Sequence, residues 1–484
     1  DEGTGQAPNS RTSTLALTEN VKVYGGFSTE STKFSDRNWK VNMSVLSGDI
    51  DKNDHADGNK VVRETDDING NNAYHVVTAD GTKGTAITDN TVLDGFTITA
   101  GQANAANFSY GGGFYCDASE TSTQCNPKLD NLIFSGNYAR YGGGMCNSSA
   151  FYNSSNPTLT NVTFSGNSAD DGGAIYNKSW NPILRIAHYE NNLKITGNAL
   201  VKIDNNWGSN PRLIDVNFYD NSANKQGGAM CNSGIEGGNS SPVLMGVRFT
   251  ENTAESGGAM YNEGVDGTST SSPSLTDVTF TGNSANYYGG AMYNNGTEGG
   301  NSSPGMTNVL FSGNSAEFHA GAIYNDGTNN GTSSPKMTNV TISGNHAVMV
   351  AGGIFNNGIR GSCKPRIRNS ILWNNQDATG NDTIFANISN NAAFTELSYS
   401  ITEGAGASGI DNWTTNTSYI DKGGNIHTNP KFRAPVNPSS APTIKGNLRL
   451  SIYSPAIDVG NNDYMTGVHT DIDGRDRVQD GDGD

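Results

Sequence analysis

The chain has 484 residues, a formal net charge of −17 at pH 7, 34% hydrophobic residues, 16% charged residues and 61 glycines. This acidic balance argues against a nucleic-acid-binding protein, which needs a basic surface. No apolar run is long enough to cross a membrane as a helix. Low charge with abundant Gly, Asn and Ser also occurs in disordered chains. Here, however, the apolar residues recur at regular positions, which predicts an ordered, turn-rich, all-β chain.

Residues 1–100 are predicted to form the first coils of a solenoid, with longer loops than the coils that follow. Short strand-like segments occur here at 21–27, 43–49, 74–78 and 92–99. Each contains β-branched or aromatic residues, as expected of short strands.

An acidic loop, GDIDKNDHADG, lies at 48–58 within this region. Asp49, Asp51, Asn53 and Asp57 place oxygen ligands at alternating positions, as a calcium loop does. The loop lacks the later Glu of an EF-hand, so the alternative is a solvated polar turn. Calcium is the only cofactor that the sequence predicts. The tail at 471–484 is similarly acidic but lies at a terminus, where disorder is the default.

The five cysteines give few clues to the compartment. Cys116 and Cys125 flank a polar loop and are predicted to form a local disulfide. Cys146 and Cys231 take the place of tyrosines in other copies of the repeat, so we expect them to be small apolar fillers in a stack. Cys363 lies in the loop GIRGSCKP, as a free thiol or as one that pairs with another chain.

Residues 101–376 form a regular array of repeats. The sequence GGAMYN occurs at 257–262 and 289–294, and Phe249, Phe280 and Phe311 are each separated by 31 residues. A fixed period of this length indicates a unit that buries its apolar face only by stacking on its neighbours. The array continues in two drifted copies, one at Ile342 and Asn345 and one at Leu372 and Asn375.

Each repeat contains short strand-like pieces and lacks hairpin dipeptides between long strands. In 274–283, Val278 and Phe280 alternate with polar residues, as a strand with one buried face requires. The predicted fold is therefore a parallel β-helix with rungs of about 31 residues. Stacking would place Phe over Phe and Asn over Asn, and an internal Asn ladder would satisfy its own buried amides.

Two further segments complete the predicted organisation. Pro182, Leu184, Tyr189 and Asn192 have the internal spacing of Pro157, Leu159, Phe164 and Asn167, which predicts a degenerate rung at 178–210. Residues 377–484 are expected to form irregular C-terminal coils and an acidic, anchor-proximal tail.

The chain resembles two kinds of bacterial surface protein. GGA[MI]YN alternating with FSGNSA is similar to the repeats of polymorphic outer-membrane-protein-type surface proteins. The motifs VYGGF, VLSGDID, YHVVT, LDGFTITAG, ILWNN and SPAIDVGN resemble exported β-helical proteins that end in a "choice-of-anchor" segment. The resemblance implies a right-handed β-helix at the cell surface. Members of that family have a strand-rich segment upstream and a different terminal motif, so we expect the chain to be a fragment or a processed form.

Catalytic residues are not identified by the sequence. β-Helical polysaccharide lyases and glycoside hydrolases need clustered carboxylates, or basic residues with metal-binding Asp, on one face. Asp170 and Asp171 form a single pair, and His188, His319 and His346 are isolated. Glu236, Asp266 and Glu298 occupy similar loop positions, so stacking would bring them together, with solvation as the simplest outcome.

We therefore expect a non-enzymatic, extracellular or cell-surface β-helix with a structural or adhesive role. Its partners would be other copies of itself, or glycans or proteins of a cell surface or matrix. One alternative is a self-assembling subunit of a filament, sheath or surface layer. A second is a polysaccharide lyase or glycoside hydrolase.

Overall fold

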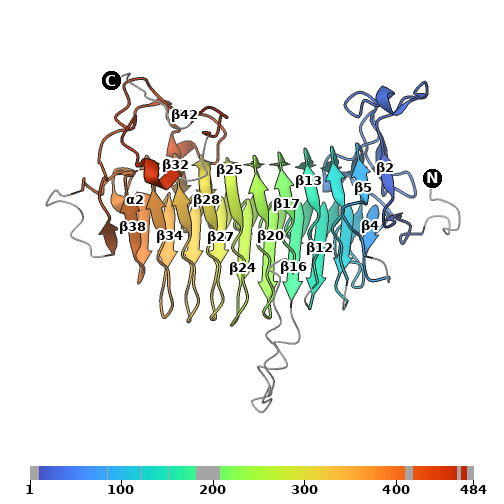
Figure 1. The fold of residues 1–484 in the computed structure, drawn as a ribbon, viewed down its shortest axis with the longest axis horizontal. Helices are drawn as coiled ribbons and strands as arrows, with labels where there is room; N and C mark the ends of the chain where they lie inside the picture. Colours follow the sequence, from blue (N-terminus) through green and yellow to red (C-terminus); the bar gives the residue numbers. More distant parts are fainter. Residues whose placement is uncertain are drawn as a thin grey trace, which may run out of the picture.

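Each repeat contributes short strands to three sheets, and each strand pairs in parallel with the equivalent strand of the neighbouring rungs. Phe249 lies in register with Phe280, and Phe280 with Phe311. Like-on-like pairing produces three long parallel sheets, which we number 1 to 3 (Figure 1). The predicted parallel β-helix is confirmed. The computed structural model describes residues 10–83, 86–120, 123–151, 153–180, 208–408, 418–465 and 470–476.

Sheet 1 contains the strands that follow the Gly-Gly pairs of the array and the strands in register with them. In order along the stack these are β1 (Leu15–Leu17), β4 (Val77–Asp80), β8 (Phe114–Ala118), β12 (Met145–Ala150), β16 (Ile175–Trp180), β20 (Met230–Ile235), β24 (Met260–Gly264), β27 (Met292–Asn295), β30 (Ile323–Asp326), β34 (Ile354–Asn357) and β37 (Ile388–Asn391).

Sheet 2 contains the alternating strands before each Gly-Asn turn, arranged in two columns that β25 (Ser274–Thr281) and β28 (Gly305–Ser312) bridge. The first column is β2 (Lys22–Tyr24), β5 (Val92–Asp94), β9 (Lys128–Asp130), β13 (Thr158–Thr160), β17 (Arg212–Ile214), β21 (Val243–Met245), β31 (Lys336–Thr338), β35 (Arg366–Arg368), β38 (Thr395–Ser398) and β40 (Tyr419–Asp421). The second is β3 (Val45–Ser47), β6 (Thr97–Thr99), β10 (Ile133–Ser135), β14 (Thr163–Ser165), β18 (Asn217–Tyr219), β22 (Arg248–Thr250), β32 (Thr341–Ser343), β36 (Ile371–Trp373) and β39 (Ile401–Thr402).

Sheet 3 is narrower and joins the other two. Its strands are β7 (Gln102–Ala103), β11 (Tyr138–Ala139), β15 (Ser168–Asp171), β19 (Ser222–Gln226), β23 (Thr253–Ser256), β26 (Ser284–Tyr288), β29 (Ser315–Ala316) and β33 (His346–Ala347). Outside the solenoid, β41 (Phe432–Ala434) and β42 (Asn447–Leu450) form an antiparallel pair. The short helices are η1 (Phe34–Asp36), η2 (Thr65–Asp67), α2 (Ile384–Asn387), η3 (Pro438–Ser440) and η4 (Asn462–Met465).

A column of phenylalanines runs through the core. Neighbouring rings lie nearly parallel, with centroids 4.6 to 5.1 Å apart, and all are fully buried. Burial of each such side chain stabilises the fold by about 1.5–3 kcal/mol. The members are Phe134, Phe164, Phe218, Phe249, Phe280 and Phe311.

Two buried ladders of asparagine accompany this column. In the first, each side-chain amide donates to the carboxamide oxygen of the next rung, at 2.8 to 3.0 Å, from Asn137 to Asn375. The second runs through sheet 1 from Asn147 to Asn356, with spacings of 2.7 to 2.8 Å. The Phe-x-x-Asn pattern predicts the first ladder. The second, at the end of each GGAMYN, was not anticipated from the sequence.

The predicted degenerate rung at 178–210 falls largely outside the described residues. On either side of it, β13 pairs directly with β17, β14 with β18 and β16 with β20. The rung that ends at Trp180 therefore stacks straight onto the rung that contains Arg212. The prediction of an intervening rung is wrong, because matching internal spacing does not by itself establish strand register.

The residue before each first-ladder Asn forms a corner column in which the backbone has positive φ. At Gly136 and Gly313, φ is 57° and 62°. A Cβ there would lie 2.6 Å from Val62 O and 2.2 Å from Thr443 O. The N-terminal segment thus packs against one end of the column and the C-terminal segment against the other, on the same edge of the solenoid (Figure 1). In the rungs between these two ends, Asp220 and Glu251 occupy the equivalent position of the corner column.

Candidate functional surfaces

The acidic loop of the N-terminal region brings Asp49 and Asp51 near Asp54, a residue that the sequence pattern did not single out. Asp49 accepts hydrogen bonds from the backbone of Asn53 and Asp54, at 3.1 and 3.4 Å. Burial of Asp54 and the charges of Asp49 and Asp51 raise the pKa of Asp54. Gly70 closes the loop, because a Cβ there would meet the side chains of Asn53 and Asp51.

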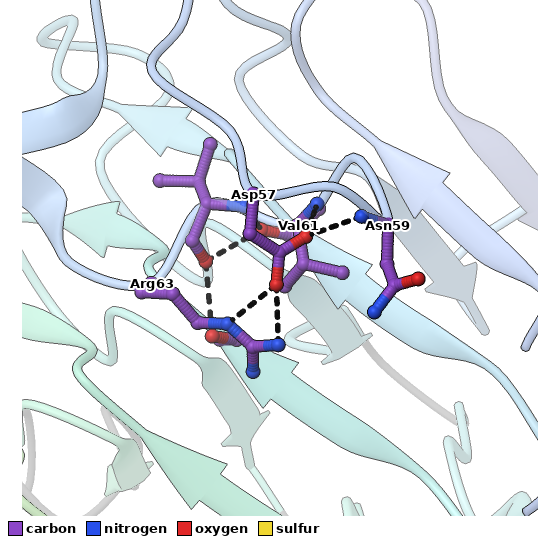
Figure 2. A network of polar contacts seen from close by, with 7 residues as sticks. Asp57, Asn59, Val61 and Arg63 are labelled. Atoms are coloured by element: carbon purple, nitrogen blue, oxygen red, sulfur yellow. Dashed lines mark hydrogen bonds and ion pairs between the residues drawn. The ribbon is translucent and has the colours of Figure 1, made fainter.

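Asp57, the fourth predicted calcium ligand, is bonded within a separate turn (Figure 2). Its carboxylate accepts from the backbone of Asn59 and Val61 at 2.8 and 3.1 Å, and from Nε of Arg63 at 2.9 Å. Desolvation opposes its ionisation, but these hydrogen bonds outweigh that effect and lower the pKa of Asp57. The turn holds the neighbouring Val62 on the solenoid, where its carbonyl accepts from Ser135 at 2.9 Å.

The described ranges contain no group of three or more His, Cys, Asp or Glu side chains arranged to hold a metal ion. Asp51 nevertheless has one buried carboxylate oxygen, Oδ1, without a hydrogen-bond partner. The calcium site at Asp49, Asp51, Asn53 and Asp57 therefore stays a prediction. The hydrogen bonds of Asp57 hold its carboxylate in a separate turn instead.

The cysteines divide into one pair and three buried thiols. A disulfide joins Cys116 to Cys125. Cys146 and Cys231 are free and lie in register with Tyr176 and Tyr261, as fillers in the tyrosine column. Cys363 is also free and only 1% exposed, so its thiol is buried within the chain. Burial raises the pKa of all three thiols and so disfavours the thiolate form.

The outer face of sheet 1 carries a second apolar cluster, built from Cys146, Tyr176, Cys231 and Tyr261 with further tyrosines packed against it. Three carboxylates lie beside this cluster. Burial raises the pKa of Asp171 to about 6 and also raises those of Glu263 and Asp326. Sequence reasoning noted Asp171 but missed the other two.

Two of these carboxylates have a structural partner. Ser233 donates to Glu263 at 2.7 Å, and Tyr293 donates to Asp326 at 3.2 Å. A raised carboxyl pKa is a property of general acids, but it also follows from packing beside aromatic rings. The hydrogen bonds favour a packing role on this face.

The loops that follow sheet 1 stack as predicted. The backbone N–H of Glu236 donates to Asp266 at 3.2 Å, and that of Gly267 donates to the backbone carbonyl of Glu298 at 3.0 Å. Asn329 donates to the Glu298 carboxylate at 3.0 Å. Neutral donors thus stabilise the acidic residues of neighbouring rungs.

An apolar ridge stands at the edge of sheet 3, formed by Tyr287, Phe318, Val348 and Met349. These side chains are 38% to 48% exposed and occupy three successive rungs. Backbone hydrogen bonds of 3.1 Å join Phe318 to Tyr287 and Met349 to Phe318. The ridge was not anticipated, although its signal is visible as a departure from the Ser/Thr/Asn-rich repeat at these positions.

Two segments of the chain, residues 161–178 and 277–295, match the Chlamydia polymorphic membrane protein (Chlamydia_PMP) repeat. Each segment runs from sheet 2 through a first-ladder Asn into sheet 1. No curated protein sequence matches the chain. The rungs are thus similar to the repeat of a membrane-protein family. None of the described helices is long and apolar enough to cross a membrane.

Proposed function

We propose that the protein is a non-enzymatic β-helix of the cell surface or extracellular space, with an adhesive role. The likeness of its rungs to the polymorphic membrane protein repeat supports the location. The disulfide between Cys116 and Cys125 also supports it, because disulfides persist in oxidising compartments.

The observation that carries the adhesive role is the apolar ridge. Large apolar side chains that stand together on a surface mark contact sites. Here Tyr287, Phe318 and Met349 form a continuous ridge on a chain of net charge −17. The repeated Phe and Asn residues are fully buried and hold the rungs together, which leaves recognition to positions where the copies differ. The partners we propose are surface or matrix glycans and proteins.

Tyr287→Ser/Phe318→Ser/Met349→Ser tests this role in assays of the full chain binding to cells and to matrix-coated surfaces. Tyr219→Ser/Met245→Ser is the control, because both residues are exposed apolar side chains elsewhere on the solenoid. We expect the ridge variant to lose binding and the control to keep it. Equal binding by all three proteins would overturn the adhesive role.

Self-assembly is the second candidate, and the same ridge favours it, since an apolar ridge can pack against a second copy. Light scattering of the wild-type chain at high concentration separates the two roles. Ordered polymers that disappear in the ridge variant would assign the ridge to assembly. A monomer that binds surfaces would assign it to adhesion.

Release of reducing or unsaturated sugar ends from acidic polysaccharides would contradict the non-enzymatic role.

A further inference from the structure

A small cavity lies between sheet 2 and the C-terminal segment that returns along the solenoid. Its volume is about 270 Å³, and its charged and aromatic walls are formed by Arg366, Arg368, Lys422, Glu396 and Tyr464. Three cations and one carboxylate therefore meet at one cavity in a chain of net charge −17.

Arg368 is a local departure from the repeat, whereas Arg366 lies in register with Lys336. Along the first column of sheet 2, Thr276, Thr307 and Thr338 lie in register, and Arg368 takes the next position. Stacking of the rungs explains the threonines, since identical residues pair along the sheet. It does not require an arginine at the following rung, so the charge at this position calls for a local explanation.

The ion pairs at the cavity leave positive charge in excess. Arg366 pairs with Glu396 at 3.0 Å. Within the described part of the chain, neither Arg368 nor Lys422 lies within 4.0 Å of a carboxylate as an ion pair. Asp421, next to Lys422, accepts from Ser408, Gly423 and Asn425 at 2.7 to 2.8 Å. Its charge is thus stabilised by neutral donors from its own turn and from Ser408.

The aromatic wall is held in place by the C-terminal segment. The side chain of Asn369 donates to Asn461 O and accepts from Asn461 N, both at 2.9 Å. This pair fixes the start of η4, which carries Tyr464. The guanidinium of Arg368 lies 4.6 Å from the centre of the Tyr464 ring. Packing on the ring orients the guanidinium while its N–H groups stay available to a ligand.

We propose that this cavity binds an oxyanion: a carboxylate, sulfate or phosphate group carried by a small molecule or a single sugar residue. A guanidinium matches the two oxygens of such a group, and Lys422 adds a second positive charge. The volume suits a ligand smaller than a typical drug molecule. This binding does not depend on the adhesive role, since the ridge residues do not line the cavity.

Isothermal titration calorimetry of the full chain in 150 mM salt tests the site with three separate probes: galacturonate, sulfate and inorganic phosphate. Galactose is the neutral control. The variant Arg368→Gln/Lys422→Gln removes the two cations. The matched control, Arg212→Gln/Arg248→Gln, removes two exposed arginines from the same sheet, so the net charge changes equally.

We expect saturable binding of at least one anion, weakened about tenfold or more in the cavity variant and less than twofold in the control. The anion that binds identifies the source of the oxyanion. Arg368→Lys keeps the charge but removes the planar guanidinium, and we expect it to weaken anion binding by an intermediate amount. This single variant tests the site if the double variant fails to fold. Absence of saturable binding, equal weakening in the control, or equal affinity for galactose would each overturn the proposal.

Discussion

Asn252 offers a sharp test of the first asparagine ladder. The residue is fully buried, and its carboxamide oxygen accepts from both the backbone N–H and the side-chain amide of Asn221, at 3.1 and 3.0 Å. Its own amide donates to Asn283 at 3.0 Å and to Phe218 O at 3.2 Å. Truncation to alanine removes all four hydrogen bonds.

The cost can be worked out from what remains. The side-chain amide of Asn221 keeps Phe164 O and Tyr219 O as acceptors, and Asn283 Oδ1 still accepts from the backbone of residue 252. The backbone N–H of Asn221 loses its partner in a buried position, which costs about 1–3 kcal/mol. With about 1 kcal/mol for the other lost bonds, Asn252→Ala should lower the free energy of unfolding by about 3 kcal/mol.

Guanidinium-induced unfolding followed by circular dichroism measures this loss. Asn224→Ala is the control, because Asn224 is an exposed asparagine one rung away whose side chain donates to Asp170 at 3.0 Å. Its substitution should change stability by no more than about 0.5 kcal/mol. Equal stability of the two variants would refute the assignment of the ladder as a stabilising element.

Three further predictions concern a charge, a corner and a loop. Burial raises the pKa of Asp171 to about 6. The protonated carboxyl therefore stabilises the fold fully at pH values below the pKa of the unfolded chain, about 3.9. This stabilisation is lost as the pH rises through about 6. In the variant Asp171→Asn, the free energy of unfolding should therefore vary less with pH between pH 4 and 7. The expected reduction in this variation is about 1–2 kcal/mol after solvent screening. Gly313→Glu should expose residues 430–465 to protease without lowering the melting temperature of the solenoid, because Glu251 already occupies this corner in another rung; unchanged cleavage would contradict it. Calcium should raise the melting temperature by about a few degrees, an effect that Asp49→Ala/Asp51→Ala abolishes; a wild-type chain insensitive to chelator would remove the site.

The sequence predicts the fold well wherever identical residues recur at a constant period. Phe249, Phe280 and Phe311 establish both the rung length and the register, because a parallel stack places equal positions on top of each other. The same reasoning failed at 182–192. There the spacing and three of the four residues matched, but β16 and β20 on either side pair directly with each other, so matching residues alone did not establish strand pairing.

The surfaces were harder to predict, because they depend on contacts between distant segments. The packing of Tyr464 on Arg368 joins residues 96 positions apart, and no local pattern encodes it. The corner column carries a readable signal, since Asp220 and Glu251 replace glycine between the rungs against which the two terminal segments pack. That signal becomes interpretable only once both terminal segments are seen to lie on the same edge (Figure 1).

The central claim is that repeated residues build the stack and departures from the repeat bind ligands. Parallel measurement of melting temperature and anion affinity in Asn252→Ala and Arg368→Gln/Lys422→Gln tests it most directly. We predict that the first variant melts earlier but keeps its affinity for the anion, and that the second melts as the wild type does but loses affinity. The claim would be contradicted if folded Asn252→Ala lost its affinity for the anion while Arg368→Gln/Lys422→Gln kept full affinity.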